Sequence, residues 1–123
     1  MTAHRVAKDL HVAASNMILI VNDPGDAATI TIDRNPAVVE LVTATAETRT
    51  LADPAGPGVT CVIVLKTDGG DCVVTASSAI NQTGNTVLTF GDVNDSVQLY
   101  SIQDGSGTFA WRIAGNDTVA ASG

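Results

Sequence analysis

The sequence of 123 residues has few aromatic side chains, few basic side chains and no long apolar run. Only 3% of the residues are aromatic, and 6 Lys and Arg stand against 13 Asp and Glu, a formal net charge of −7. A negative protein repels phosphate backbones and anionic lipids, so we expect no binding to nucleic acid or to a membrane. The apolar run at residues 17–21 is far shorter than the roughly 20 residues of a membrane-spanning helix, and no signal-peptide pattern precedes it. These absences predict a soluble protein that is not exported.

Cysteine and histidine are also scarce. The two cysteines, Cys61 and Cys72, lie on either side of residues 68–71 (Asp-Gly-Gly-Asp), whose Gly-Gly pair suits the two-residue loop of a β-hairpin. In such a hairpin the two thiols would lie roughly 20 Å apart, too far for a disulfide. Both cysteines are therefore expected to be reduced and buried. The only histidines, His4 and His11, lie near the N-terminus, which argues against a Cys–His metal site.

Small and β-branched residues take the place of the missing aromatic ones. The chain has 15 Val, 15 Thr, 17 Ala and 11 Gly. Branching at Cβ restricts χ1 and fits a pleated sheet better than a helix, so the composition predicts an all-β protein with one core. Only 15% of the residues are charged, which indicates that a partner covers part of the apolar surface. The alternative is a monomer with a weakly polar surface rich in Thr, Ser and Ala.

The N-terminal region differs from the rest of the chain. Residues 1–15 carry a net charge of +1, so the remaining 108 residues carry −8. We interpret residues 1–27 as an extended N-terminal arm and residues 28–123 as the β domain. Alternatively, residues 16–21 form the first strand of the sheet. If the arm binds a partner, its basic and apolar side chains are the candidate contacts, namely Arg5, Lys8, Leu10, Val12, Met17 and Ile18.

From residue 28 onward, short apolar stretches alternate with turns rich in Gly, Pro, Asn and Asp. Turns about every 8–12 residues are typical of a sandwich or barrel, and short loops favour antiparallel pairing. The predicted fold class is all-β, a single antiparallel β-sandwich or small barrel with an extended N-terminal arm. The predicted strands are residues 28–32, 37–43, 47–51, 59–66, 72–76, 86–90, 96–102 and 108–114.

Alternation within these strands predicts which side chains face the core. Trp111 is in phase with the apolar residues on either side of it, so we expect it to be a core residue and not a platform for sugar stacking. Val62, Val64 and Tyr100 face outward as apolar exceptions and are candidates for a partner surface. The predicted core contains Val39, Leu41, Cys61, Ile63, Leu65, Leu88, Phe90, Val97, Leu99, Phe109, Trp111 and Ile113.

The predicted β domain lacks the side chains of most catalytic sites. It has no histidine, no Gly-x-Ser-x-Gly nucleophile motif and no Gly-Lys-Ser/Thr phosphate loop. Its aspartates lie in turns next to Gly or Asn, where the Asp side chain bonds the turn backbone, so we interpret them as turn-forming. Residues 92–95 (Asp-Val-Asn-Asp) contain only a fragment of a calcium loop. The sequence therefore predicts no enzyme, no cofactor and no resident metal.

Several segments occur in a recognisable order: residues 59–70 (VTCVIVLKTDGG), 91–101 (GDVNDSVQLYS), 104–107 (DGSG) and 109–113 (FAWRI). Together they resemble the small β domains of tailed-bacteriophage structural modules, over roughly residues 37–115. Within that group a free-standing chain is most similar to head decoration, or cement, proteins. The resemblance implies a homotrimer that is made in the host cytoplasm, binds the major capsid protein on the outer surface of the virion and stabilises the head.

A decoration role needs no catalytic group, because a small oligomer that bridges shell subunits adds contacts that must break before the subunits separate. Two other classes remain open. A phage tail-fibre, host-attachment or carbohydrate-binding module could share the fold but should expose aromatic platforms. An enzyme subunit would need a nucleophile and a base, which the β region does not offer.

Overall fold

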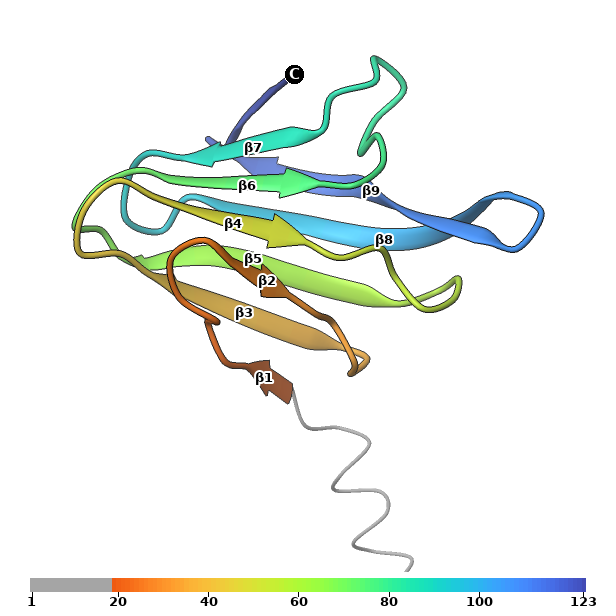
Figure 1. The fold of residues 1–123 in the computed structure, drawn as a ribbon, viewed down its shortest axis with the longest axis horizontal. Coiled ribbons are helices and arrows are strands. Elements are labelled where there is room, and N and C mark those ends of the chain that lie inside the picture. The colour runs from red at the N-terminus through yellow and green to blue at the C-terminus, as the bar shows by residue number, and fades with distance from the viewer. Residues whose placement is uncertain (1–18) are drawn as a thin grey trace, which may run out of the picture.

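The computed structural model describes residues 19–123, and this part of the chain forms strands, turns and loops without a helix. Ten strands make two five-stranded sheets around one core cluster (Figure 1). The all-β prediction is confirmed, in a sandwich-like arrangement in which neither sheet closes into a barrel. Among the described residues there is no helix capable of crossing a membrane. The strands are β1 (Leu19–Val21), β2 (Ala28–Ile30), β3 (Ala37–Val42), β4 (Glu47–Leu51), β5 (Thr60–Thr67), β6 (Cys72–Ala76), β7 (Val87–Phe90), β8 (Ser96–Gly105), β9 (Thr108–Asp117) and β10 (Ala120–Ser122).

The prediction of a purely antiparallel sandwich is wrong, because both sheets are mixed. Sheet A has the strand order β1-β3-β5-β8-β9 and sheet B the order β10-β7-β6-β4-β2. From β1 to β6 the chain alternates between the two sheets. Between two successive strands of one sheet, the chain runs back through a strand of the other sheet, so both strands start at the same end of the molecule. The neighbours β1, β3 and β5, and likewise β2, β4 and β6, are therefore parallel. The remaining strand pairs are antiparallel.

The connection at residues 68–71 does not close the predicted hairpin. β5 pairs with β3 and β8 in sheet A, whereas β6 pairs with β4 and β7 in sheet B. The two glycines instead allow a close approach to the crossover between β3 and β4. A Cβ atom on Gly69 would lie 2.3 Å from the carbonyl oxygen of Thr43, and one on Gly70 would lie 2.3 Å from the carbonyl carbon of Thr45. Only glycine fits where two backbones pack this closely.

The inward faces of both sheets are apolar, as the alternation predicted. Burying a side chain such as Ile63 or Leu65 contributes roughly 1.5–3 kcal/mol. Trp111 is buried, and its Nε1 donates a hydrogen bond to the carbonyl oxygen of Ala52 at 2.9 Å, which satisfies its one polar atom. Of the predicted core residues, Phe109 is only half-buried and Ile113 packs at the margin of the core. The others are buried: Val39, Leu41, Cys61, Ile63, Leu65, Leu88, Phe90, Val97, Leu99 and Trp111.

Residues 19–27, which belong to the predicted arm, contribute to the sandwich-like domain. β1 pairs in parallel with β3, and Val21 packs against the core. The strand interpretation of residues 16–21 is thus confirmed for Leu19–Val21. Residues 22–27 then cross from sheet A to sheet B, and Asp23 lies in this β1–β2 connection.

Cys61 and Cys72 are buried free thiols, as predicted. They lie on strands of opposite sheets, β5 and β6. Burial raises the pKa of Cys61 to about 12 and that of Cys72 to about 11. Because the thiolate is the reactive form, neither side chain is a nucleophile at neutral pH.

Candidate functional site

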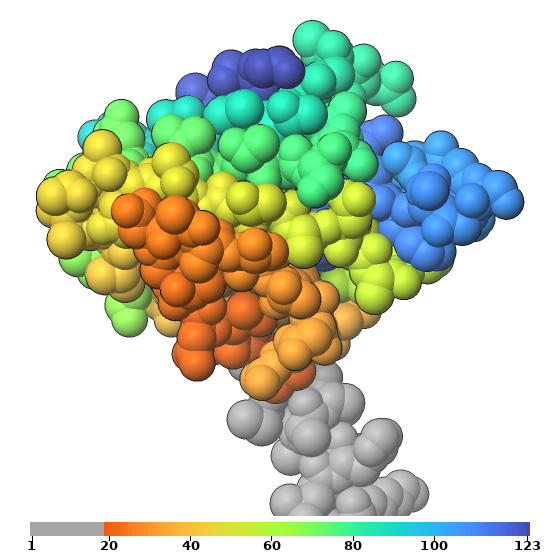
Figure 2. Space-filling view, in the orientation of Figure 1, coloured from red at the N-terminus to blue at the C-terminus, as the bar shows by residue number. Residues whose placement is uncertain are grey.

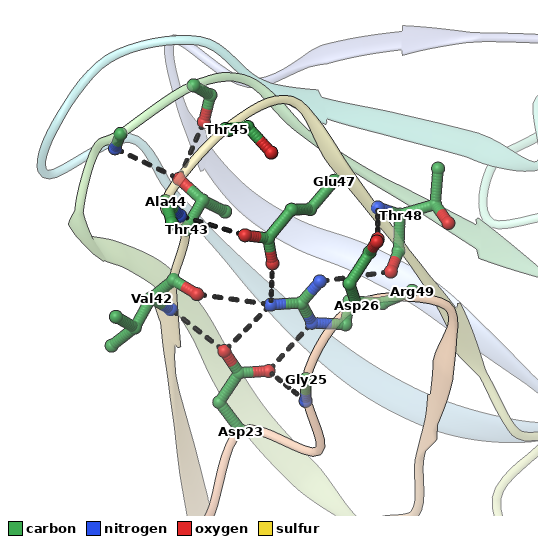
Figure 3. A network of polar contacts seen from close by, with 12 residues as sticks. Asp23, Gly25, Asp26, Val42, Thr43, Ala44, Thr45, Glu47, Thr48 and Arg49 are labelled. Carbon is green, nitrogen blue, oxygen red and sulfur yellow. Dashed lines mark hydrogen bonds and ion pairs between the residues drawn. The ribbon is translucent and has the colours of Figure 1, made fainter.

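A buried arginine organises the end of the molecule where β3 finishes and β4 begins (Figure 3). The Arg49 side chain is fully buried and forms a two-point contact with Asp23, with Nε 2.7 Å from Oδ1 and Nη2 2.9 Å from Oδ2. Its Nη2 also donates to Glu47 Oε1 at 3.0 Å and to the carbonyl oxygen of Val42 at 3.2 Å, and Nη1 donates to the carbonyl oxygen of Thr48 at 3.0 Å. One side chain therefore joins three segments of the chain.

The charges of this network determine each other's ionisation. Burial alone would raise the pKa of Asp23, but hydrogen bonds from Arg49 and from the backbone N–H groups of Val42 and Gly25 outweigh burial and lower it. The N–H of Ala44, and then Arg49, lower the pKa of Glu47. Asp23 in turn raises the pKa of Arg49, so the guanidinium stays charged.

The hydrogen bonds of this network join separate parts of the fold. In the described part of the chain, every buried side-chain nitrogen or oxygen has a hydrogen-bond partner. It attaches the β1–β2 connection, through Asp23, to the end of β3 and the start of β4. Arg49 is not among the predicted core residues, although it is two residues from Leu51 in β4 and therefore points inward with it.

A second polar contact shapes the turn between β7 and β8. The Asp95 side chain is buried and accepts hydrogen bonds from the backbone N–H groups of Gly91 and Asp92, each at 3.0 Å, and from the Thr118 hydroxyl. The hydrogen bond from Thr118 is the main cause of its lowered pKa. The turn-forming interpretation of this aspartate is confirmed, and the contact also joins the turn to the β9–β10 connection.

The lowered pKa values of Asp23 and Asp95 predict a loss of stability in acid. Both folded pKa values lie below the ordinary value of 3.8, so the unfolded chain takes up protons first as the pH falls. The stability that these groups contribute is complete above about pH 5 and is lost as the pH falls through the folded pKa values. The urea midpoint, measured by circular dichroism, should drop below about pH 4, and Asp23→Asn should reduce that drop.

The matched control for the acid experiment is Asp104→Asn, in the exposed β8–β9 hairpin. It should leave the dependence of the midpoint on pH as it is in the wild type. A midpoint that is equally high at about pH 3 and pH 7 would contradict the role of the two carboxylates.

Negative charge is concentrated at one end of the molecule, where five connections meet: residues 22–27, 43–46, 68–71, 91–95 and 118–119. Eight of the 13 acidic residues lie in or directly beside these connections, and Arg49 is buried among them. This acidic end repels a second acidic end, which disfavours a contact between two such ends. The eight residues are Asp23, Asp26, Glu47, Asp68, Asp71, Asp92, Asp95 and Asp117.

The outer face of sheet A has the opposite character. Aliphatic side chains from β1, β3 and β5 lie together on it, and Ile20, Val38 and Val62 form a continuous row across the three strands. Ile20 and Val42 are 54% and 49% exposed, which is unusual for large aliphatic residues. The charged pair on these strands, Lys66 and Glu40, is 3.5 Å apart and self-compensating. We call Ile20, Val38, Val42, Val62 and Val64 the aliphatic patch.

The outer face of sheet B is more polar. Its outward residues are mostly threonines, and Thr29, Thr50 and Thr75 lie side by side across β2, β4 and β6. They alternate with buried residues in each strand, so their hydroxyl groups face solvent. The two faces of the domain therefore offer different chemistry, and the aliphatic patch is the better candidate for contact with a protein.

The structure locates some of the predicted partner residues. Val62 and Val64 belong to the aliphatic patch, and Tyr100 lies further across sheet A, on β8, with 40% of its surface exposed. The outward orientation predicted for these three side chains is confirmed. The candidate contacts of the arm, namely Arg5, Lys8, Leu10, Val12, Met17 and Ile18, lie outside the described residues.

Within residues 19–123, no three His, Cys, Asp or Glu side chains are grouped so that they could hold a metal ion.

Comparison with known proteins finds no relative of this chain: no protein-family model matches the sequence, and no curated protein matches it.

Proposed function

We propose that this chain is a capsid decoration protein of a tailed bacteriophage, which forms a homotrimer and binds the outer surface of the major capsid shell. The observation that carries the proposal is the aliphatic patch on an otherwise strongly acidic chain. The sequence segments that resemble tailed-bacteriophage structural modules support the same role. So does the observation that the buried polar groups hydrogen-bond to other parts of the same domain. Such a protein acts by binding alone and needs a rigid body, a self-association face and a contact with the shell.

The aliphatic patch suits association between copies of the chain. β3 and β5 run side by side for about 20 Å and the three-residue β1 for about 10 Å, so at a strand spacing of about 4.8 Å the patch covers roughly 250 Å², close to the lower end of the size of functional apolar patches. Two chains of net charge −7 repel each other at long range, so contact between copies is favoured at an apolar surface without net charge. The patch meets that condition because Lys66 neutralises Glu40 beside it.

Association through the patch predicts that one charged side chain will separate the copies. Val62→Glu should convert a species of three times the 12.5 kDa chain mass into a single chain, because each contact would bury an unpaired carboxylate. The matched control is Val73→Glu, since Val73 is also half-buried and faces outward from a central strand, but in sheet B. Light scattering after size exclusion measures the mass. A wild-type monomer, or equal masses for the two variants, would contradict the patch as the interface.

The shell contact is expected at the end of the molecule away from the acidic residues. Leu19 pairs with Ala37, the first residue of β3, so the chain before residue 19 joins the domain at the end opposite the acidic connections. Residues 1–15 are the part of the sequence with net positive charge. We therefore propose that the N-terminal segment reaches toward the shell.

Deletion of residues 2–15 should lower the occupancy of the protein on purified heads while the trimer mass stays the same. The reason is that the deleted segment contains four of the six candidate shell contacts, Arg5, Lys8, Leu10 and Val12, but no part of the aliphatic patch. Co-sedimentation with heads that lack the protein measures occupancy, and Val73→Glu is again the control. Unchanged occupancy would remove the segment from the shell contact, and failure of the full-length chain to sediment with heads would refute the decoration role.

A further inference from the structure

Arg112 differs from the other cations of the described chain. Arg34, Arg49 and Lys66 each have a carboxylate oxygen within 4.0 Å. No carboxylate of residues 19–123 lies that close to Arg112, although acidic residues outnumber basic ones about two to one in the sequence. Its Nη1 donates to the carbonyl oxygens of Ala79 and Trp111. The guanidinium is thus held in place by neutral carbonyl groups, and no carboxylate of the described residues pairs with its positive charge.

The other two guanidinium nitrogens of Arg112 face solvent. Neither Nε nor Nη2 has a hydrogen-bond partner among the described residues, and Arg112 as a whole is half-buried. No buried side-chain nitrogen in this part of the chain lacks a partner. Both nitrogens must therefore be accessible, and they present a planar pair of donors that matches the two oxygens of a carboxylate.

A concavity of about 260 Å³ lies beside these donors. Tyr100 lines it and is the direct cross-strand neighbour of Arg112 on β8, so the phenol ring and the guanidinium lie side by side on sheet A. Ile80 and Ile102 provide an apolar lining, and Gln82 adds an amide that can donate and accept hydrogen bonds. The concavity therefore combines an exposed aromatic ring, a guanidinium with two parallel hydrogen-bond donors and an amide.

The loop that completes the concavity is held firmly against β9. The N–H of Ile113 donates to the carbonyl oxygen of Ile80 at 3.0 Å, and Arg112 holds the neighbouring carbonyl of Ala79. The Asn81 side chain accepts hydrogen bonds from the N–H groups of Gly84 and Asn85, each at 3.0 Å. These contacts set the positions of the lining side chains before any ligand binds, which lowers the entropy cost of binding.

We propose that this concavity is a binding subsite for a carboxylated sugar, a hexuronate. The carboxylate would pair with Nε and Nη2 of Arg112, the apolar C–H face of the sugar ring would pack on Tyr100, and a ring hydroxyl would bond the Gln82 amide. The subsite does not depend on the proposed capsid role. It lies on the β8–β9 side of sheet A, whereas the aliphatic patch covers β1, β3 and β5.

The distribution of charge is compatible with an anionic ligand despite the net charge of −7. Eight acidic residues are gathered at the end formed by the five connections described above, whereas the concavity adjoins the 79–82 loop at the other end of β6. The exposed tyrosine favours a sugar over a carboxylate on a protein side chain, because a lone carboxylate would leave the ring and the amide without a partner.

Titration of ¹⁵N-labelled protein with glucuronate, glucose and acetate, followed by NMR, tests this subsite. Glucuronate should shift the signals of the residues around the concavity with a millimolar Kd, roughly tenfold tighter than glucose or acetate. Arg112→Gln should abolish the preference for glucuronate over glucose, and Arg112→Lys, which keeps the charge without the fork, should reduce it. Tyr100→Thr should weaken both sugars, and Tyr100→Phe should retain them.

The matched control is Arg34→Gln, which removes an exposed arginine at another site and should leave all three titrations unchanged. Acetate that binds as tightly as glucuronate would overturn the proposal in favour of a plain carboxylate site. The absence of saturable shifts at tens of millimolar glucuronate would also overturn it. Sedimentation of Tyr100→Thr with purified heads separates the two hypotheses, because loss of sugar binding should leave the occupancy unchanged.

Discussion

Replacing Arg49 by methionine should lower the free energy of unfolding by about 3–5 kcal/mol, the usual effect of breaking a buried ion pair from one side. Methionine has a similar length, so the main change is the loss of the charge and its donors. The carboxylates of Asp23 and Glu47, with side chains only 11% and 12% exposed, would then lack their cation. The carbonyl oxygens of Val42 and Thr48 would also lose a donor. Urea denaturation at neutral pH measures the change.

Arg34→Met is the control for this experiment. The Arg34–Asp33 pair is 3.5 Å apart and both side chains are at least half-exposed, so its loss should cost less than about 0.5 kcal/mol. A loss of less than about 1 kcal/mol for Arg49→Met would show that the network is not needed for stability. A larger effect at pH 7 than at about pH 3 is also expected, because protonated carboxyls need the guanidinium less.

Gly70→Ala should destabilise the domain by about 2–3 kcal/mol, although only one methyl group is added. That methyl would lie 2.3 Å from the carbonyl carbon of Thr45 and 2.4 Å from the backbone nitrogen of Ala46. These are main-chain atoms, so no side-chain rotation relieves the clash. The hydrogen bond from the Thr43 hydroxyl to the carbonyl oxygen of Gly70, 2.7 Å long, would be strained by the same movement. The melting temperature measures the effect.

Gly56→Ala is the matched control, because a Cβ atom there would meet nothing within 4 Å and the backbone is not in the left-handed region. It should be neutral or stabilise the fold by up to about 1 kcal/mol, since alanine restricts the unfolded chain. Equal melting temperatures for Gly70→Ala and the wild type would mean that the two crossovers separate easily. In that case the domain would not be the rigid body that the proposed function requires.

The contacts that stabilise the domain and the residues of the proposed ligand subsite lie in different parts of the molecule. In Figure 2 the connections around residues 43–46, in yellow, and the β8–β9 hairpin, in blue, lie at opposite ends of the molecule. Glycine packing, Arg49 and Asp95 all stabilise the acidic end. The concavity with Arg112 and Tyr100 is supported separately, by the loop that follows β6. We therefore expect substitutions at Arg49 or Gly70 to change stability without altering the chemistry of the ligand subsite.

Some features of the candidate sites follow from the sequence pattern. Arg49 alternates in phase with Leu51, and a charged residue at an inward position needs a buried partner. Nothing in the sequence indicated that the partner would be Asp23, which is 26 residues away. The alternation predicts the outward orientation of Tyr100, but its neighbour Arg112 becomes part of a concavity only through the loop that follows β6.

The β class, most strand positions and the inward residues of each strand follow from the order of the amino acids. Their origin is local, because β-branched residues fit a pleated strand and a period of two assigns each side chain to a face. Which strands are neighbours depends on how the folded chain packs. The alternation in β5 is the same whether its partner is β6 in a hairpin or β3 in a parallel pair, so the choice depends on contacts such as Gly70 against Thr45 that join residues distant in the chain.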